Sequence, residues 1–596
     1  MKFINSLSVG ILCSFLLAVC FIYPSYVFGI LPPITYFKWF LLIFVSYFTL
    51  KQYRKEHHEY TISAKAIVLG GLLFLPLIIA NLCYELVQIS HHGWYHNGYV
   101  LQILQDIYPL KNVNAPGLPT TTYWSFHYLV ATFSEAFHYP SFRVNAALNC
   151  FALYVCFVLI DKILRELKVK PSGVWYFALM LIVLFNGDPF GSFSFIGNVL
   201  AFDLDVFSFD MPWQAELWMI PYLPVKKYFI IQLTTMYSKF FNFSGVPLGV
   251  ASFLFSLYNM ILFRKKMDNQ WILLISCAGT FFIHTTIGLF TLFALPLALC
   301  IEFLINGRLD ELWNFAKKNI LFIIVAAFYA GLVVYYLLSA STVFGASKIT
   351  VFRRLIWNMY SLLLFNAPLV VFTFFATKYG KNIDLKRHDA RFLIILFLIG
   401  GLMSWFISIH VANQYKFMYL TSIVAGFLFA LWVNNRKWIL FITVLIFCNL
   451  QIINYGFHFS KIWSSFENTI KFEGAYSIGS QMTTWIRENS PKDAVVLAPM
   501  NILNSEDFVH SGRLPYIRED WAFMSGAPLE DRTIDVTSFY APQNTAQEQA
   551  QLAEKILEKS QSTTLTILLP QEIKLSFSDR FQKAKSFDEF DIYVFE

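Results

Sequence analysis

Long apolar segments alternate with short polar ones along most of the chain. The apolar runs approach about 20 residues, the length that an α-helix needs to cross a hydrocarbon core of about 30 Å. A β-barrel would instead show shorter segments of alternating polarity. The pattern therefore predicts a polytopic α-helical membrane protein with about 13 transmembrane helices. Their expected bounds are about 4–28, 35–50, 62–83, 144–161, 174–186, 246–263, 271–285, 287–305, 319–339, 358–377, 391–411, 416–433 and 437–456.

Composition agrees with a membrane protein. Of the 596 residues, 57% are hydrophobic and 14% are charged, whereas a soluble domain has about 25% charged residues. The eight cysteines lie in or beside apolar segments and form no Cys-x-x-Cys pair, so we expect neither disulfides nor a zinc cluster. The N-terminal apolar run is longer than the core of a signal peptide, so we interpret it as a retained first helix.

Positive charges are concentrated in alternate loops. If the N-terminus is cytoplasmic, the loops on its side include "KQYRKEHHEYTISAK", "RKK" and "KYGKNIDLKRHDAR", and the opposite loops carry few Lys or Arg. Cytoplasmic loops of membrane proteins are enriched in these residues. We therefore expect a multi-pass protein of the cell (inner or plasma) membrane with a cytoplasmic N-terminus. The net charge of +7 is interpreted as this orientation signal, and no nucleic-acid partner is indicated.

The last part of the chain has the character of a small α/β domain. Residues 479–500 predict a helix, a turn and a strand, "NTAQEQAQLAEKILEKS" another helix, and "TLTILLP" and "FDIYVFE" two strands. An odd number of spans places this region outside the cytoplasm. We therefore expect a transmembrane domain over 1–456 and an extracytoplasmic α/β domain over 457–596. Arg513 lies in a segment, "HSGRLPYIRED", that we expect to be exposed, and it is a candidate for binding an anionic group.

Two long outer loops, 84–142 and 187–245, are rich in aromatic residues, Gly and Pro. This composition suits segments that lie at the level of the lipid headgroups, and it argues against disorder. Nine of the twelve histidines would lie on or near the outer face. They are either amphipathic rings at an interface or parts of an outward-facing polar site.

The first outer loop contains the segment "HHGWYHNGYVLQIL". A helix that starts near His92 would place His92 and His96 on one face, a spacing that can hold a metal ion or phosphate oxygens. The alternative is that these histidines cap an amphipathic interfacial helix. Glu85, at the outer end of the third expected span, needs a partner such as a loop histidine or a metal, unless it is solvated at the interface.

Other candidates lie farther along the chain. Asp203 and Asp205 could bind Mg²⁺ or Mn²⁺, because hard cations prefer oxygen ligands, although acidic residues are common in any hydrated loop. His284 lies between two short spans, either as a packing residue or as part of an outer site. Lys416 lies at the outer mouth of a late span, where it could pair with a phosphate or extend its ammonium to the interface.

The order of these parts resembles the GT-C superfamily of membrane glycosyltransferases, which use polyprenyl-phosphate-linked sugars. The resemblance rests on "HHGWYHNGYVLQILQDIYPLKNVNAPGLPTTTYWSFHYLVA", on "HVANQYKF" and on the C-terminal segments. His96 matches the histidine of the family, and His127 lies in the helix that follows the Pro/Gly-rich link. The catalytic Asp of the family is expected just before "WYH", where this chain has two histidines. The nearest acidic residues are Glu85 and Asp106.

The resemblance implies inverting transfer of a sugar from a polyprenyl-phosphate donor to a cell-envelope glycan, lipid or protein on the outer face. Two alternatives stay open: a transporter or flippase of lipid-linked intermediates, and a non-catalytic GT-C-like protein of envelope assembly. The candidate residues are Glu85, His92 and His96 for catalysis, His127, His284, Lys416 and Arg513 for substrate binding, and Asp203 and Asp205 for Mg²⁺ or Mn²⁺.

Overall fold

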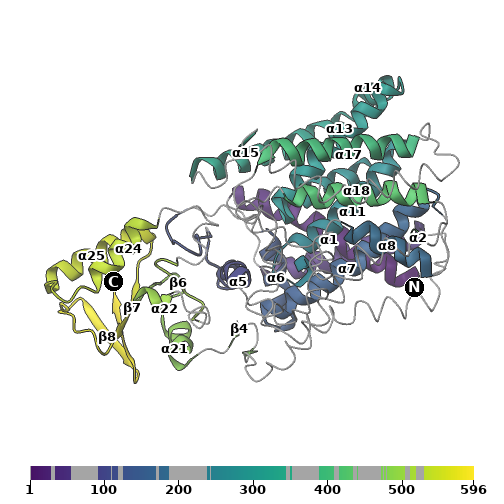
Figure 1. The fold of residues 1–596 in the computed structure, drawn as a ribbon. Helices are drawn as coiled ribbons and strands as arrows, with labels where there is room; N and C mark the ends of the chain where they lie inside the picture. Colours follow the sequence, from purple (N-terminus) through teal and green to yellow (C-terminus); the bar gives the residue numbers. More distant parts are fainter. Residues whose placement is uncertain are drawn as a thin grey trace, which may run out of the picture.

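A computed structural model gives the fold of the chain, shown in Figure 1. Most helices form one bundle, and a smaller region of mixed α and β structure, which contains the C-terminus, lies beside it. The N-terminus lies at the end of the bundle that is far from this C-terminal region. The described residues are 2–28, 34–55, 91–108, 110–118, 125–169, 174–186, 238–241, 243–343, 350–351, 388–408, 415–433, 439, 472–473, 476–477, 480–503, 511–518 and 529–596.

The helices of the first three-quarters of the chain follow its apolar segments. One short 3-10 helix, η3, precedes the longest uninterrupted run of described helices. The elements are α1 (Lys2–Val27), α2 (Ile34–Lys55), α5 (His91–Leu104), α6 (Ser125–Phe137), α7 (Ser141–Glu166), α8 (Val174–Phe185), η3 (Ser238–Phe241), α11 (Val246–Lys266), α12 (Gln270–Ile283), α13 (Thr285–Ile305), α14 (Leu309–Lys318), α15 (Ile320–Val343), α17 (His388–Phe406) and α18 (Tyr415–Val433).

Six of the described helices are long and apolar enough to cross a membrane, and the number is seven if α14 and α15 form one bent span. The chain is therefore a multi-pass helical membrane protein. Expected spans at 62–83, 358–377 and 437–456 lie outside the described residues, Ile439 excepted. Those at 174–186 and 271–285 correspond to α8 and α12, whose 12 and 14 residues rise only about 18 and 21 Å. The total of thirteen spans therefore stays a prediction.

The short helix α14 is amphipathic and has no buried residue. Its Trp313 is 63% exposed, and Lys317 and Lys318 occupy its last turn. The helix is set at 94° to α15, at the end of the bundle away from the C-terminal region (Figure 1). An exposed aromatic ring beside lysines suits a helix that lies in the plane of a membrane surface.

Small residues allow close packing inside the bundle. At Gly10 of α1, an added Cβ would lie 2.6 Å from Thr49 Oγ1 of α2. At Gly279 of α12, it would lie 2.8 Å from the Leu16 side chain of α1. Lipid chains are as apolar as the helices, so helix association in a membrane depends on such close contact.

A buried group of charges ties three helices together at the C-terminal end of α11. Arg264 Nη1 lies 3.0 Å from Glu302 Oε1 of α13, and Arg264 Nη2 pairs with Asp389 of α17. Arg264 and Glu302 are almost fully buried. Because an isolated charge is costly inside a membrane protein, this arginine group (Arg264, Glu302, Asp389) fixes the relative position of the three helix ends.

The C-terminal region is built on a five-stranded sheet with the order β6-β5-β7-β9-β8. Strands β6, β5 and β7 run parallel, whereas β9 is antiparallel to both β7 and β8. This mixed sheet and its helices enclose a hydrophobic core of their own. The elements are α21 (Gln481–Asn489), β5 (Val495–Leu497), α22 (Met500–Leu503), β6 (Leu514–Pro515), α24 (Glu530–Phe539), α25 (Ala546–Ser560), β7 (Leu565–Pro570), β8 (Phe581–Ser586) and β9 (Phe590–Phe595).

The expected helices and strands of this region are confirmed as α21, β5, α25, β7 and β9. Four further elements, α22, β6, α24 and β8, were not expected, and α22 and β6 have only four and two residues. The sequence of α24 contains Thr533 and Ile534, which are β-branched and have a modest helix propensity. Strand β8 is an edge strand in which five of six residues are exposed, so it lacks the apolar alternation that marks a strand.

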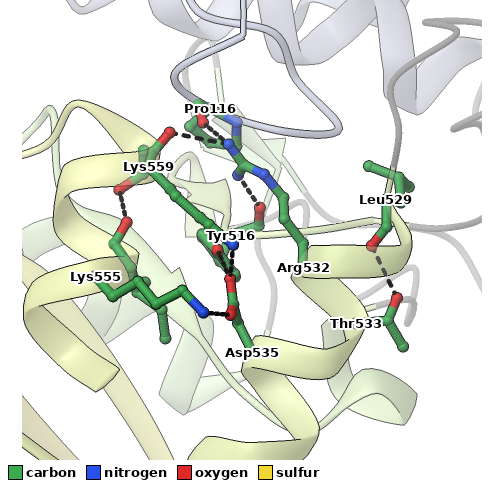
Figure 2. Close-up of polar contacts among 10 residues, drawn as sticks. Pro116, Tyr516, Leu529, Arg532, Thr533, Asp535, Lys555 and Lys559 are labelled. Atoms are coloured by element: carbon green, nitrogen blue, oxygen red, sulfur yellow. Dashed lines mark hydrogen bonds and ion pairs between the residues drawn. The ribbon is translucent and has the colours of Figure 1, made fainter. Parts of the chain in front are cut away.

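Asp535 of α24 holds a buried polar network in the C-terminal region (Figure 2). Its carboxylate accepts hydrogen bonds from Tyr516 Oη at 2.7 Å, from Lys555 Nζ at 2.7 Å and from Lys559 Nζ. Burial acts to raise the pKa of Asp535, but hydrogen bonds from Lys555, Lys559 and Tyr516 outweigh burial and hold this pKa below its ordinary value. The carboxylate is therefore charged at neutral pH and joins α24 to α25.

We expect Asp535→Asn to lower the free energy of unfolding of the C-terminal region by about 1–3 kcal/mol at pH 7, because an amide cannot replace the charged acceptor. A depressed pKa contributes stability above the unfolded pKa of about 3.9, and this contribution disappears as the pH falls through the lower folded value. The difference between wild type and variant should therefore be constant from about pH 5 to 7 and shrink below about pH 4. Hydrogen exchange of peptides that contain β5 and β7, corrected for the intrinsic pH dependence of exchange, measures this difference in stability in the full-length protein.

The matched control is Asp588→Asn, since Asp588 is exposed. Equal effects of the two substitutions at every pH would contradict the proposed role of the network.

Candidate functional site

Two histidines from different helices meet inside the bundle. His96 Nδ1 of α5 and His127 Nε2 of α6 are 2.7 Å apart, and the rings are stacked with centroids 4.9 Å apart. Both side chains are buried. One proton between these nitrogens makes one ring the donor and the other the acceptor. Contact between the two histidines fixes the orientation of both imidazoles.

Aromatic residues enclose this histidine pair (His96 and His127). Tyr95 and Tyr99 share a hydrogen bond of 3.2 Å, and the ring of Tyr99 lies 5.4 Å from that of His127. The ring of Phe243, just before α11, lies 6.1 Å from that of His96. Apolar and phenolic walls of this kind exclude water from the imidazoles.

Helix α5 begins at His91, one residue before the expected position. His92 and His96 are therefore about one turn apart on α5, as expected. Glu85 lies outside the described residues, as do Asp203 and Asp205. Their assignments stay predictions.

A second group combines two lysines and a histidine. Lys239 of η3, His284 and Lys416 of α18 are all buried. Both lysines interact electrostatically with His284. The two ammonium groups also lie over one ring, because Lys239 Nζ is 5.3 Å and Lys416 Nζ is 5.6 Å from the centroid of Tyr415. We call Lys239, His284 and Lys416 the lysine cluster.

The position of His284 depends on a break between two helices. His284 is extended, at φ −151° and ψ 104°, between the end of α12 and the start of α13. Its Nδ1 accepts a hydrogen bond of 3.4 Å from the backbone N–H of Ile287 and thereby caps α13. The expected location between two apolar helices is confirmed, but only α12 is short, since α13 has 21 residues.

A single short segment connects the two groups. Lys239 belongs to the lysine cluster, whereas Phe243, four residues later, contacts His96 and also packs on Phe142 of α7 at 5.4 Å. Asn149 of α7 holds the segment through a hydrogen bond of 2.9 Å to the carbonyl oxygen of Phe240. Residues 238–241 and 243–245 therefore lie between a group suited to proton transfer and a group suited to binding an anion.

Lys239 was not among the residues singled out from the sequence. It is a lysine in an aromatic segment, "SKFFNF", and its only local signal is a charge among apolar residues. Its meeting with Lys416 depends on packing between parts of the chain that are far apart in sequence.

Arg513 belongs to neither of these two groups and lies in the C-terminal region, directly before β6. We expected its segment to be exposed, and this was wrong: Arg513 and Arg518 are 7% and 5% exposed. The guanidinium of Arg513 donates hydrogen bonds to Gln105 Oε1 at 3.0 Å and to the carbonyl oxygens of Arg487 and Ser490. A role of Arg513 in substrate binding stays a prediction.

No group of three His, Cys, Asp or Glu that could share a metal ion occurs among the residues that the structure describes. Binding of Mg²⁺ or Mn²⁺ by Asp203 and Asp205 stays a prediction from the sequence.

No protein-family profile matches this chain, and no curated protein does. Among solved structures, the chain is similar to the oligosaccharyltransferase of Archaeoglobus fulgidus, whose crystal structure has an acceptor peptide with the NVT sequon tethered through a disulfide bond. The sequences are 14% identical, the match covers 84% of this chain and 68% of the other, and the TM-score is 0.35. Similarity at this level is too distant to carry an argument about function.

The break at His284 requires a very close approach of α12 and α13. At Gly288, an added Cβ would lie 2.0 Å from the Cα of Phe281. We expect Gly288→Ala to lower the free energy of unfolding by about 1–3 kcal/mol, because backbone atoms must separate to accept the methyl group. Retention of the folded protein after heating in detergent, followed by size-exclusion chromatography, measures the change in Tm.

Gly331→Ala is the matched control, because Gly331 is also helical and an added Cβ there meets nothing within 4 Å. Alanine favours a helix over glycine by about 1 kcal/mol, so the Tm of this control should stay the same or rise. A similar fall of Tm in both variants would contradict the proposed close contact.

Proposed function

We propose that the protein is an integral membrane glycosyltransferase of the GT-C type. It transfers a sugar from a polyprenyl-phosphate donor to a cell-envelope glycan, lipid or protein on the outer face of the membrane. The observation that carries the proposal is the burial of Lys239 and Lys416 together with His284, one segment away from the histidine pair.

Binding of a phosphate explains why two cations lie buried together. Ionisable residues inside membrane proteins are costly and mark sites for ions or charged substrates. Two neighbouring ammonium groups repel each other, and an anion between them removes this repulsion. A phosphate on a lipid chain would reach such a site from the bilayer, which a soluble anion cannot do.

The histidine pair supplies the proton chemistry. In the proposed reaction, an acceptor oxygen forms a bond with the anomeric carbon, and the bond between this carbon and the phosphate oxygen breaks. The acceptor proton moves to a base, for which His96 Nε2 is the proposed atom, because its Nδ1 is held by His127. The polyprenyl phosphate leaves with the electron pair, and Lys239 and Lys416 offset its negative charge.

Glu85 and His92 stay candidates for the base as well. No step is assigned to a metal ion, since the ligands proposed for it, Asp203 and Asp205, lie outside the described residues.

The proposal also includes the orientation of the protein in the membrane. The N-terminus is cytoplasmic, and thirteen spans then place the C-terminal domain outside the cytoplasm. The lysine cluster includes residues at the N-terminal ends of α13 and α18, whereas the arginine group lies at the C-terminal ends of α11 and α13. The two groups therefore lie at opposite ends of α13. Lys265 and Lys266 lie in the last turn of α11, beside the arginine group, and these positive charges support a cytoplasmic position for that end.

We expect Lys239→Met and Lys416→Met each to lower kcat/KM for sugar transfer by at least about tenfold. Each substitution removes a positive charge that would offset the negative charge of the leaving phosphate. The assay uses purified full-length protein, synthetic polyprenyl-phosphate sugars and envelope acceptors, with products detected by mass spectrometry. Lys318→Met, on the exposed face of α14, is the matched control and should retain wild-type turnover.

Absence of turnover with every donor, together with an unchanged envelope glycan profile in a deletion strain, would exclude a glycosyltransferase. Movement of a lipid-linked intermediate in proteoliposomes without covalent change would identify a transporter or flippase. A phenotype that survives Glu85→Gln and His92→Ala but is lost on truncation after residue 457 would identify a non-catalytic assembly protein.

The orientation has its own test. A reporter fused after residue 500 should be active only outside the cytoplasm, and one inserted at Asp268, between α11 and α12, only inside it. A cytoplasmic signal from the fusion at residue 500 would overturn the orientation and the outer-face site with it.

A further inference from the structure

The segment that follows α5 makes several hydrogen bonds with the C-terminal region. Four side-chain or backbone groups of residues 105–118 bind that region directly. The bonds are Gln105 Nε2 to Gly512 O at 3.1 Å, Lys111 Nζ to Gln561 O at 2.9 Å, Arg518 N to Asn114 O at 3.0 Å and Arg532 Nη2 to Pro116 O at 2.5 Å. We call this set, with the bond from Arg513 to Gln105, the loop–domain contact.

Arg513 connects the C-terminal region to the end of α5. One terminal nitrogen, Nη2, donates to the carbonyl oxygens of Arg487 and Ser490, so the guanidinium is anchored at the end of α21. The other, Nη1, donates to Gln105 Oε1 at 3.0 Å. The Gln105 amide group is thus held on both sides, because its nitrogen donates to Gly512 O. A planar guanidinium can make these bonds together, and a lysine ammonium cannot.

The segment after α5 also folds back on α5. Gln102 of α5 bonds the backbone of Lys111 twice, from its Nε2 to the carbonyl oxygen at 3.0 Å and from the amide N–H to its Oε1 at 2.7 Å. At Gly98, one turn before Gln102, an added Cβ would lie 2.5 Å from the side chain of Val113. Helix α5 and residues 105–118 therefore form one unit.

Arg532 closes the far side of the contact (Figure 2). Its guanidinium lies over the ring of Tyr516 at 4.6 Å and donates to the carbonyl oxygens of Tyr516, Pro116 and Lys559. Gly117 packs on the same place with φ +88°, and an added Cβ would lie 2.0 Å from the carbonyl oxygen of Lys559. Only glycine fits there.

We infer that the C-terminal region sets the rotation of α5, and with it the orientation of His96, through Arg513 and Gln105. Arg513 is then a positioning residue for His96, which lies about 13.5 Å of helix rise before Gln105. The importance of this coupling rests on the proposed function of His96. The coupling itself is tested by the chemical accessibility of the imidazole, which requires no substrate.

The experiment measures the rate at which diethyl pyrocarbonate modifies His96 in the full-length protein in detergent, resolved by peptide mass spectrometry. His96 is buried, so its modification reports release of α5, and the exposed His138 is the internal reference. Arg513→Lys should raise the rate at His96 at least about tenfold, because it removes charge-assisted hydrogen bonds from the contact. Arg580→Lys, on an exposed arginine paired with Glu554, is the matched control and should leave it unchanged.

Gln105→Ala removes the same hydrogen bond with Arg513 by changing its acceptor, and it changes no residue of the C-terminal region. It should raise the rate at His96 as Arg513→Lys does, and the double variant should exceed neither, since both remove one interaction. Rates within about twofold of wild type in both single variants would overturn the inference.

Gly117→Ala tests the close packing of the loop–domain contact, because its added methyl group would collide with the carbonyl oxygen of Lys559. Gly307→Ala is its control. Both glycines have positive φ, but an added Cβ at Gly307 meets nothing within 4 Å. His96 should become reactive in the first variant only, and equal rates in the two would again overturn the inference. If His96 becomes reactive in these variants but the wild-type protein transfers no sugar, the coupling is supported and only the proposed function is contradicted.

Discussion

A polar group inside the bundle must find its partner within the protein, because hydrocarbon offers no water to solvate it. This constraint explains the arrangement of the described residues. Arg264 is matched by carboxylates on two other helices, and His284 caps the helix whose start it interrupts. Lys239 and Lys416 both lie over the ring of Tyr415 and near His284, and like charges this close repel each other. Their burial together therefore has a cost in stability, which the proposed binding of a phosphate would offset.

Elements with a strong local signal could be predicted from the sequence. Helix α25 carries a reciprocal capping box between Thr545 and Glu548, and its apolar residues have helical spacing. The start of α5, at His91, is one residue from the start near His92 that the sequence predicts. Strand β8 could not be found in this way, because an edge strand needs no apolar face. The number of spans stays a prediction, since the apolar helices α8 and α12 have only 12 and 14 described residues.

The sequence could predict several residues of the candidate site, but it could not predict which of them lie together. His96 and His127 each stood out, yet their contact joins two helices that are separated by 20 residues in the sequence, from Gln105 to Trp124. Lys239 carries no local sign that it meets Lys416. Arg513 lies in a polar segment that suggests solvent, and its burial depends on Gln105, which precedes it by 408 positions. Pairings over such distances depend on tertiary packing, which local patterns do not encode.

The two edges of the C-terminal sheet differ from its centre in one respect. Strand β6 has only two residues, and β8 carries Lys583 and Lys585, with an irregular register between them against β9. Short, charged or irregular edges make poor templates for pairing with a strand of another molecule. Copies of the protein crowded in one membrane can therefore stand side by side without polymerising through their sheets.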